Sequence, residues 1–258
     1  MRPCRISARG GLEGGRLLVF KSLPSTNRWA IEHLSELRHG DVIRAVRQTA
    51  GQGRFGREWV SPEDRGLAVS FILETARLGG DLSSRLTQAA ALAARATLAA
   101  MGLDAKVKWP NDVWVMGRKI AGMLAEGRSD AGAVVVGVGI NVNLTAQDLS
   151  RGPWGSAATS VCLQAGRVCD VGRLAARLTR EMARALAALR TGGAGWLTGE
   201  WDAHDALREC DITVQTGQGS VAGRYLGVAP DGGLMMRLGD GEVRDFLSGD
   251  VTLRGKGI

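Results

Sequence analysis

The chain has 258 residues, of which 45% are hydrophobic and 23% are charged, as expected for a globular protein with one large and one small domain. No apolar run approaches the roughly 20 residues that cross a bilayer. The Arg- and Gly-rich N-terminus also lacks the apolar stretch of a secretory signal, so we expect a cytoplasmic protein with no membrane partner. The four cysteines form no CxxC pair, which argues against a disulfide framework and a zinc site.

The formal net charge of +7 comes mainly from arginine, because the chain has only five lysines. The arginines are dispersed and form no basic block, so we expect no sequence-specific DNA binding. An acidic partner or a phosphate-bearing substrate fits this charge equally well. Three of the five lysines, Lys106, Lys108 and Lys119, lie close together, where the chain uses a compact ammonium instead of the rigid fork of arginine. This clustering suggests that the chemistry lies near that segment.

The N-terminal part of the chain predicts strands that alternate with helices. Strands are expected at 16–23 and 42–46, and an uninterrupted apolar strand at 67–73 is expected to be covered on both faces. A short helix with capping side chains at 24–27 follows the first strand, and an Ala-rich helix with an apolar stripe covers 83–101.

Three strand-like runs follow, at 106–115, 119–125 and 133–144. The first two are joined by residues 116–118, which are few enough for a hairpin. Strict alternation along the returning strand would place Lys119 and Gly122 on opposite faces.

The C-terminal part predicts two helices and then only strands. The helices cover 171–190, with a stripe of leucines that faces inward, and about 196–207. Five short strands follow, at 211–215, 221–228, 234–238, 243–247 and 251–253. Their spacing and their Gly- and Asp-containing turns suggest a small barrel, with a domain boundary near Glu209.

A glycine-rich loop at 51–56 matches G-x-G-x-x-G, the pattern of dinucleotide-binding sites. Such a site requires a helix that begins at the third glycine, whereas Ser61-Pro62 and then a strand follow here, which argues against it. The loop carries Arg54 and Arg57, so it either binds a carboxylate or phosphate or is a flexible surface loop. Because it has three glycines in six residues, we expect it to be mobile until an anionic ligand orders it.

The segment Lys108-Trp109-Pro110-Asn111-Asp112 places a proline inside a predicted strand. Because proline removes a ladder donor, we expect either a bulge that turns side chains towards a cleft or an edge strand that breaks there.

Two further features are open to two interpretations each. Lys119 stands seven residues beyond Asp112, where it is either a ligand-binding lysine or an ordinary surface lysine of a hairpin. The apolar strand that ends in GVGIN (137–141) either leaves room for a ligand and offers an amide, or is a plain core strand.

Taken in order, four segments resemble the successive motifs of biotin protein ligases: Ser25-Thr26-Asn27, GQGRFGREW (51–59), KWPNDVWVMGRKIAG (108–122) and GVGIN (137–141). The resemblance runs from about residue 17 to the C-terminus, and KWPND followed by RK-x-AG at this distance is highly specific. The family's loop usually reads GRGRxGR. Gln52 stands where the family has the first arginine, whereas Arg54 matches. About 24 residues precede Ser25, so the resemblance is to the monofunctional type without an N-terminal DNA-binding domain.

The resemblance implies an α+β fold. A class II synthetase-like mixed β-sheet with flanking helices would form a catalytic domain over 1–208, and an SH3-like β-barrel would cover 209–258. It implies an enzyme that forms biotinyl-5'-AMP from biotin and ATP with Mg²⁺. The biotin would then pass to a lysine of a biotin carboxyl carrier protein, a part of acetyl-CoA or acyl-CoA carboxylase. The oligomeric state is left open, a homodimer included.

The resemblance also implies roles for individual residues. Lys119 and Arg54 would be catalytic, because both would hold the biotin carboxylate and the α-phosphate, and Asp112 would steer Mg²⁺. The biotin-binding residues would be Ser25, Thr26, Asn27, Gln48, Gln52, Gly53, Arg54, Lys119 and Gly122. The residues that bind ATP or the adenylate would be Arg54, Arg57, Trp59, Asn111, Lys119 and Asn141. The base that deprotonates the target lysine is not identified.

Two other classes of protein are considered. A lipoate ligase would share the fold and reaction type, but its RRxxGGGxVxHD-like signature is absent from this sequence. A biotin-responsive binding module without catalysis is disfavoured by Lys119 and the arginine-bearing loop.

Overall fold

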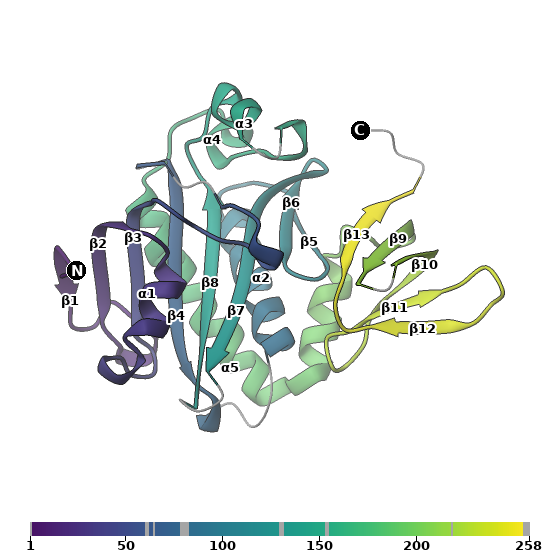
Figure 1. Ribbon diagram of the computed structural model, residues 1–258, viewed down its shortest axis with the longest axis horizontal. Coiled ribbons are helices and arrows are strands. Elements are labelled where there is room, and N and C mark those ends of the chain that lie inside the picture. The colour runs from purple at the N-terminus through teal and green to yellow at the C-terminus, as the bar shows by residue number, and fades with distance from the viewer. Residues whose placement is uncertain are drawn as a thin grey trace.

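The structure is a computed structural model that describes residues 2–59, 62–63, 65–77, 83–128, 132–152, 155–217 and 219–254. Within these residues the strands form two sheets, a large mixed one and a smaller one near the C-terminus (Figure 1). The large sheet has the order β1-β2-β3-β4-β8-β7-β6-β5, in which β2 and β3 are parallel and the other neighbours antiparallel. Its strands are β1 (Arg5–Ser7), β2 (Leu17–Leu23), β3 (Val42–Gln48), β4 (Gly66–Glu74), β5 (Ala105–Lys108), β6 (Asp112–Val115), β7 (Arg118–Arg128) and β8 (Ala133–Asn141).

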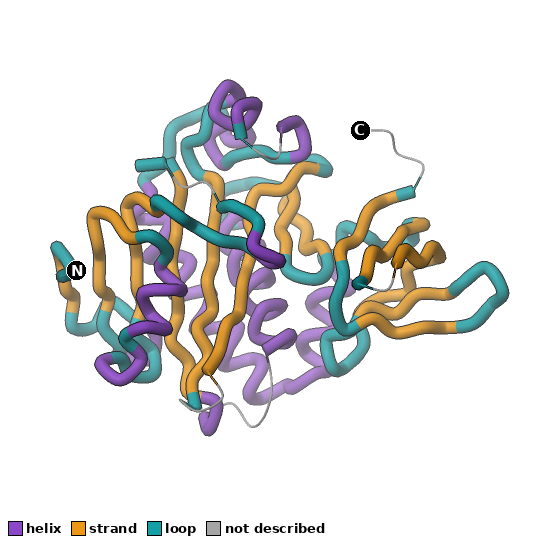
Figure 2. Tube along the Cα trace, in the orientation of Figure 1, coloured by secondary structure: helices purple, strands orange, loops and turns teal. Residues whose placement is uncertain are grey.

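The two faces of the large sheet are covered differently (Figures 1 and 2). The long helices α2 (Ser83–Ala99) and α5 (Val171–Ala203) pack side by side behind it, and the short helix α1 (Thr26–Glu32) lies in front. Strand β4 is buried along nearly its whole length, which confirms that it is covered on both faces. The shorter helices are α3 (Ala146–Arg151), α4 (Val161–Ala165) and the 3-10 turns η1 (Leu12–Gly14), η2 (Leu34–Glu36), η3 (Arg54–Gly56), η4 (Thr75–Arg77) and η6 (Gly155–Ala157).

Helix α5 joins the two helices that the sequence predicts at its position. The chain leaves helical geometry at Gly193, whose φ of 56° and ψ of −144° suit glycine, and then resumes the helix. None of the helices in the described part of the chain is both long and apolar enough to span a bilayer.

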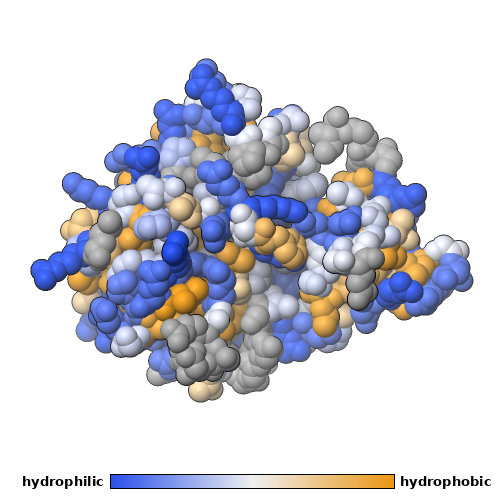
Figure 3. All heavy atoms as spheres, viewed as in Figure 1, coloured by the Kyte–Doolittle hydropathy of each residue, from blue (hydrophilic) through white to orange (hydrophobic). Residues whose placement is uncertain are grey.

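The second sheet confirms the five predicted C-terminal strands. They are β9 (Asp211–Thr216), β10 (Gly219–Val228), β11 (Leu234–Arg237), β12 (Val243–Phe246) and β13 (Asp250–Leu253). They pair antiparallel in the order β12-β11-β10-β9-β13. On the face shown in Figure 3, apolar residues gather over this sheet, where Val243 and Leu247 are exposed.

The run at 106–115 is two strands rather than one bulged strand, so the predicted bulge was wrong. The alternative, an edge strand that breaks at the proline, agrees with β5, which lies at the edge of the sheet and ends at Lys108. Val107 pairs with Val113, and Lys108 with Asp112, so β5 and β6 form a hairpin that reverses at Trp109-Pro110-Asn111. Proline at the reversal removes no hydrogen bond from the ladder.

The expected face of Lys119 is also corrected. In the β6–β7 hairpin, Val113 pairs with Ala121 but Trp114 pairs with Lys119, so β7 carries one extra residue, Ile120. Such a bulge lets two consecutive side chains point the same way, and Ile120 and Ala121 are both fully buried. The bulge therefore places Lys119 on the same face as Gly122, where a Cβ on that glycine would lie 3.2 Å from Lys119 Nζ.

Candidate active site

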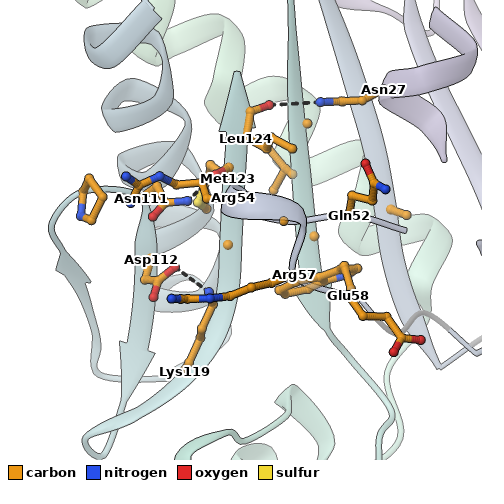
Figure 4. A pocket seen from close by; sticks show the side chains of 18 of the residues that line it. Asn27, Gln52, Arg54, Arg57, Glu58, Asn111, Asp112, Lys119, Met123 and Leu124 are labelled. Atoms are coloured by element: carbon orange, nitrogen blue, oxygen red, sulfur yellow. Dashed lines mark hydrogen bonds and ion pairs between the residues drawn. The ribbon is translucent and has the colours of Figure 1, made fainter. Parts of the chain in front are cut away.

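A pocket of about 340 Å³ lies on the face of the large sheet that carries α1. Its floor is formed by β4, β7 and β8, and one wall is the β5–β6 hairpin. The segment 49–59, here called the strap, crosses in front of β8 and β7 and covers it (Figures 1 and 4). The start of β13, at 250–252, completes the lining, so both sheets contribute to one cavity.

One end of the pocket, here called the neutral end, is lined by uncharged polar side chains around the N-terminus of α1. Ser25 caps the helix by accepting a hydrogen bond from Arg28 N. The backbone N–H and hydroxyl of Thr26 lie 2.8 and 3.2 Å from Gln48 Oε1. Asn27 donates to the carbonyl of Leu124 at 3.1 Å (Figure 4). The neutral end is therefore held by hydrogen bonds between neighbouring elements.

The glycines of the GVGIN motif make the floor narrow enough for this arrangement. A Cβ added to Gly137 would lie 2.4 Å from Asn27 Oδ1, and one added to Gly139 would lie 2.3 Å from Trp59 Cε2. Contacts this short do not occur at a real Cβ, so both positions require glycine while Asn27 and Trp59 stay where they are. This strand is therefore not a plain core strand, because two of its residues support pocket side chains.

The opposite end of the pocket, here called the cationic end, gathers four positively charged side chains. Lys119 Nζ lies 2.6 Å from Asp112 Oδ1 and 5.7 Å from the centre of the Trp59 ring. The other three cations are Arg54, Arg57 and Lys108.

Two of these cations are partly or fully removed from water. Burial lowers the pKa of the Lys108 ammonium, and nearby Asp112 acts in the opposite direction. Burial likewise lowers the pKa of Arg54, against the effect of Asp250 and Asp112. An arginine remains charged despite such a shift, so the end of the pocket keeps fixed positive charge that suits a carboxylate or a phosphate.

The strap is a small hairpin and not the start of a helix. Gly53 N donates to Arg57 O at 2.7 Å, and Trp59 N donates to Gly51 O at 2.8 Å. At its tip, Phe55 and Gly56 have φ values of 57° and 70°. The part of the chain described between Arg57 and β4 contains no helix, in agreement with the argument against a dinucleotide site.

The pocket brings together every residue predicted to bind biotin, ATP or metal except one. Those that line it are Ser25, Thr26, Asn27, Gln48, Gln52, Gly53, Arg54, Arg57, Trp59, Asn111, Asp112, Lys119 and Gly122. Asn111 Nδ2 donates to Met123 O at 2.5 Å. Asn141 is not part of the lining, and its buried amide donates to Thr159 O at 3.0 Å. The individual roles of these residues remain predictions.

Sequence reasoning missed two groups of lining residues. Lys108, Gly137 and Gly139 lie inside the motifs but were assigned no role of their own, although the GVGIN glycines were expected to leave room for a ligand and the charge of Lys108 marks it out. Asp250 and its neighbours at 251–252 carry no local signal, because only the packing of the second sheet brings them to the pocket.

The site offers no ready-made cage for a resident metal. In the residues that the structure describes, no group of three or more His, Cys, Asp or Glu could hold a metal ion. The predicted ligand, Asp112, is ion-paired to Lys119. Mg²⁺ in ATP sites is commonly held by one or two carboxylates together with substrate phosphates, so these residues fit an ion that enters with ATP.

Comparisons with known proteins agree with this geometry. Residues 19–143 match the Biotin/lipoate A/B protein ligase family, and residues 211–254 match the Biotin protein ligase C terminal domain. The chain is 31% identical to the Bifunctional ligase/repressor BirA of Escherichia coli, over 95% of this chain and 76% of that protein. It is 34% identical to a Biotin–[acetyl-CoA-carboxylase] ligase of Paracoccus denitrificans, over 83% of this chain and 90% of that one.

A solved structure has the same architecture. The biotin protein ligase from Aquifex aeolicus in complex with biotin and ATP matches with a TM-score of 0.80 and 26% identity, over 92% of this chain and 98% of that one. The fold, the pocket and these comparisons thus define a ligase of the biotin/lipoate type. The chain belongs to the biotin protein ligase family, and it is an enzyme of that family.

Proposed function

We propose that this protein forms biotinyl-5'-AMP from biotin and ATP and transfers the biotinyl group to a specific lysine of the biotin carboxyl carrier protein of a biotin-dependent carboxylase. The observation that carries the proposal is one pocket with two chemically different ends. The neutral end suits the uncharged ring system of biotin, which offers N–H donors and a carbonyl acceptor. The cationic end suits the biotin carboxylate and the ATP phosphates.

In the first half-reaction, a carboxylate oxygen of biotin attacks the α-phosphorus of ATP. The bond from that phosphorus to the bridging oxygen breaks, and pyrophosphate leaves. The two reactants repel each other because both are anionic, so the pocket must hold them in line and screen the charge on the phosphoryl oxygens. Arg54 and Lys119, which approach the same end from the strap and from β7, are the residues to which we assign this role.

The second half-reaction is aminolysis of the mixed anhydride. The neutral amine of the carrier lysine attacks the acyl carbon, an amide bond forms, and AMP leaves with the anhydride oxygen. A free lysine has a pKa of about 10.4, so a proton must be removed before attack. The proposal assigns no base to this proton.

The other predicted roles are part of the same proposal. Trp59 would flank the adenine, Arg57 and Asn111 would face the nucleotide, and Mg²⁺ would enter with ATP near Asp112. Asn141, which lies outside the lining, would act on the nucleotide only through its neighbours. We also propose a catalytic domain over 1–208, an SH3-like barrel over 209–258 and a cytoplasmic location.

The test is product identification. Purified protein with biotin, ATP and Mg²⁺ should release pyrophosphate and yield biotinyl-5'-AMP by mass spectrometry, and a carrier domain should then gain one biotinyl group. Lipoate in place of biotin should give much less adenylate. Equal or greater activity with lipoate would favour a lipoate ligase. Biotin binding without pyrophosphate release would favour a binding module, and either result would refute the proposal.

A further inference from the structure

The arginines of the strap take their anionic partner from the C-terminal sheet. Arg57 forms an ion pair with the carboxylate of Asp250, the first residue of β13. Arg54 Nη1 donates to the carbonyl of Gly249 at 3.1 Å and lies 3.8 Å from Asp250 Oδ1. Both guanidinium groups that we assign to substrate anions are therefore held by one short segment of another sheet.

The position of that segment is fixed from the catalytic side. Lys108 Nζ donates to the carbonyl of Val251 at 2.7 Å, and Lys108 is only 8% exposed. The turn between β10 and β11 is anchored as well, because Trp109 Nε1 and Gln88 Nε2 both donate to the carbonyl of Gly232, at 2.9 and 2.8 Å. Since these donors are buried, losing their acceptors would be costly, so β13 is held firmly against the pocket.

We propose that Asp250 is a positioning residue for adenylate formation, which rests on the function proposed above. It acts through Arg54 and Arg57. By pairing with the strap before substrates bind, it holds the guanidinium groups at the cationic end, so that biotin and ATP meet a preorganised site. The C-terminal sheet thereby completes the pocket.

A carboxylate beside a substrate-binding arginine has two opposite effects on substrate binding. It competes with the substrate anion for the arginine, and it orients the arginine beforehand. The side chains of Asp250 and Arg57 are 31% and 66% exposed, so water screens their attraction and the competition is weak. If the glycine-rich strap is already oriented, substrates do not have to order it when they bind. In this site that saving is larger than the loss from competition. The two effects predict opposite changes in KM when the charge is removed.

The experiment compares Asp250→Asn with Asp250→Glu and with Asp245→Asn, a matched loss of charge at an exposed position of the same sheet. Asp250→Asn should raise KM for biotin and ATP about two- to fivefold, the scale of a partly exposed ion pair, and should leave kcat within about twofold. Without ligands, trypsin should cut this variant faster after Arg54 or Arg57. Asp250→Glu should restore both properties, and Asp245→Asn should behave as the wild type.

An unchanged or lower KM in Asp250→Asn, or an unchanged rate of strap cleavage, would overturn the proposal. If asparagine unfolds the C-terminal sheet, the wild type provides a second measure. About 1 M NaCl, where the Debye length is about 3 Å, should speed the strap cut relative to cleavage of a small chromogenic substrate. Failure of the wild type to make biotinyl-5'-AMP would refute the proposed function instead, whereas the cleavage rates would still test the contact between Asp250 and the strap.

Discussion

The two ends of the pocket are built in different ways. At the neutral end, Thr26 accepts and donates hydrogen bonds with Ser70 and Gln48, and Asn27 donates to the carbonyl of Leu124 and the carboxylate of Glu126, all on strands of the large sheet. At the cationic end, Lys119 and Arg57 are each paired with a carboxylate, and Asp250 belongs to a separate sheet. The neutral end is thus a property of the large sheet alone, whereas the cationic end also depends on how the C-terminal sheet is docked. Changes at each end should therefore affect different steps.

The largest effect is expected from Lys119→Ala, which removes a cation from the cationic end. Adenylate formation should fall about 10²- to 10³-fold, the scale for loss of one donor to a developing charge. Pyrophosphate release under saturating biotin and ATP measures it. Lys106→Ala is the matched control, because Lys106 lies on β5, at the edge of the same sheet, and pairs with Asp104 outside the pocket. Near-normal activity of the Lys119 variant would remove this lysine from the catalytic assignment.

A second prediction concerns the contact between the end of helix α5 and the C-terminal sheet. Asp205 follows α5 and accepts hydrogen bonds from Leu207 N at 2.8 Å and from the hydroxyl of Tyr225 on β10. Burial raises the pKa of Asp205 from 3.8 to about 6. Between about pH 4 and pH 6 the folded protein therefore binds more protons than the unfolded chain, so stability falls as the pH rises through this window. Asp205→Asn should remove that loss, which is at most about 2–3 kcal/mol.

Urea unfolding of the wild type and of Asp205→Asn across this pH range measures the effect. The advantage of the variant should grow between about pH 4 and pH 6 and stay constant above that. Asp202→Asn is the control, because Asp202 lies on the same end of α5 but is exposed and pairs with Arg208. Parallel stability curves for wild type and Asp205→Asn would show that Asp205 does not titrate in this way.

A matched pair of glycine substitutions on β8 tests the neutral end and the cationic end of the pocket separately. Gly137→Ala places a methyl group against Asn27 at the neutral end and should raise KM for biotin about tenfold, as expected for overpacking. Gly139→Ala places it against Trp59 and should act mainly on KM for ATP. Each variant is the control for the other, because both add one methyl group to β8. The reverse pattern would mean that the two ends have been assigned to the wrong substrates.

Much of the fold follows from local patterns. The alternating and apolar runs predict most strands, and the residues after the strap predict that no helix begins there. The orientation of Lys119 could not be predicted, because a single extra residue in β7 reverses the alternation, and a bulge depends on pairing with β6. The predicted strand at 106–115 failed similarly, since a proline at a hairpin reversal and a proline at a bulge look alike in sequence.

The residues of the site likewise divide into those that local motifs predict and those that only tertiary packing brings to the pocket. The motifs identify most of the lining, including the neutral end, because their residues are close to the pocket in sequence and in space. Asn141 shares a motif with Gly137 and Gly139, yet its amide bonds to Thr159. Asp250 stands in no motif, and only tertiary packing brings it to Arg57, 193 residues away.

The smallest expected effect is protection of the strap from trypsin by biotin and ATP. The local sequence, with three glycines in six residues, predicts a mobile strap that ligands protect strongly. In the structure, however, Arg57 is paired with the carboxylate of Asp250, so by the proposal above the strap is already partly ordered before substrates bind. Less ordering is then left for the substrates to bring about than in a strap that only ligands hold. Cleavage after Arg54 or Arg57 should therefore slow only about two- to fivefold. The same ligands should protect the strap of Asp250→Asn more strongly. Equal protection in the wild type and in Asp250→Asn would mean that Asp250 does not hold the strap before substrates bind. The cationic end would then be as independent of the C-terminal sheet as the neutral end is.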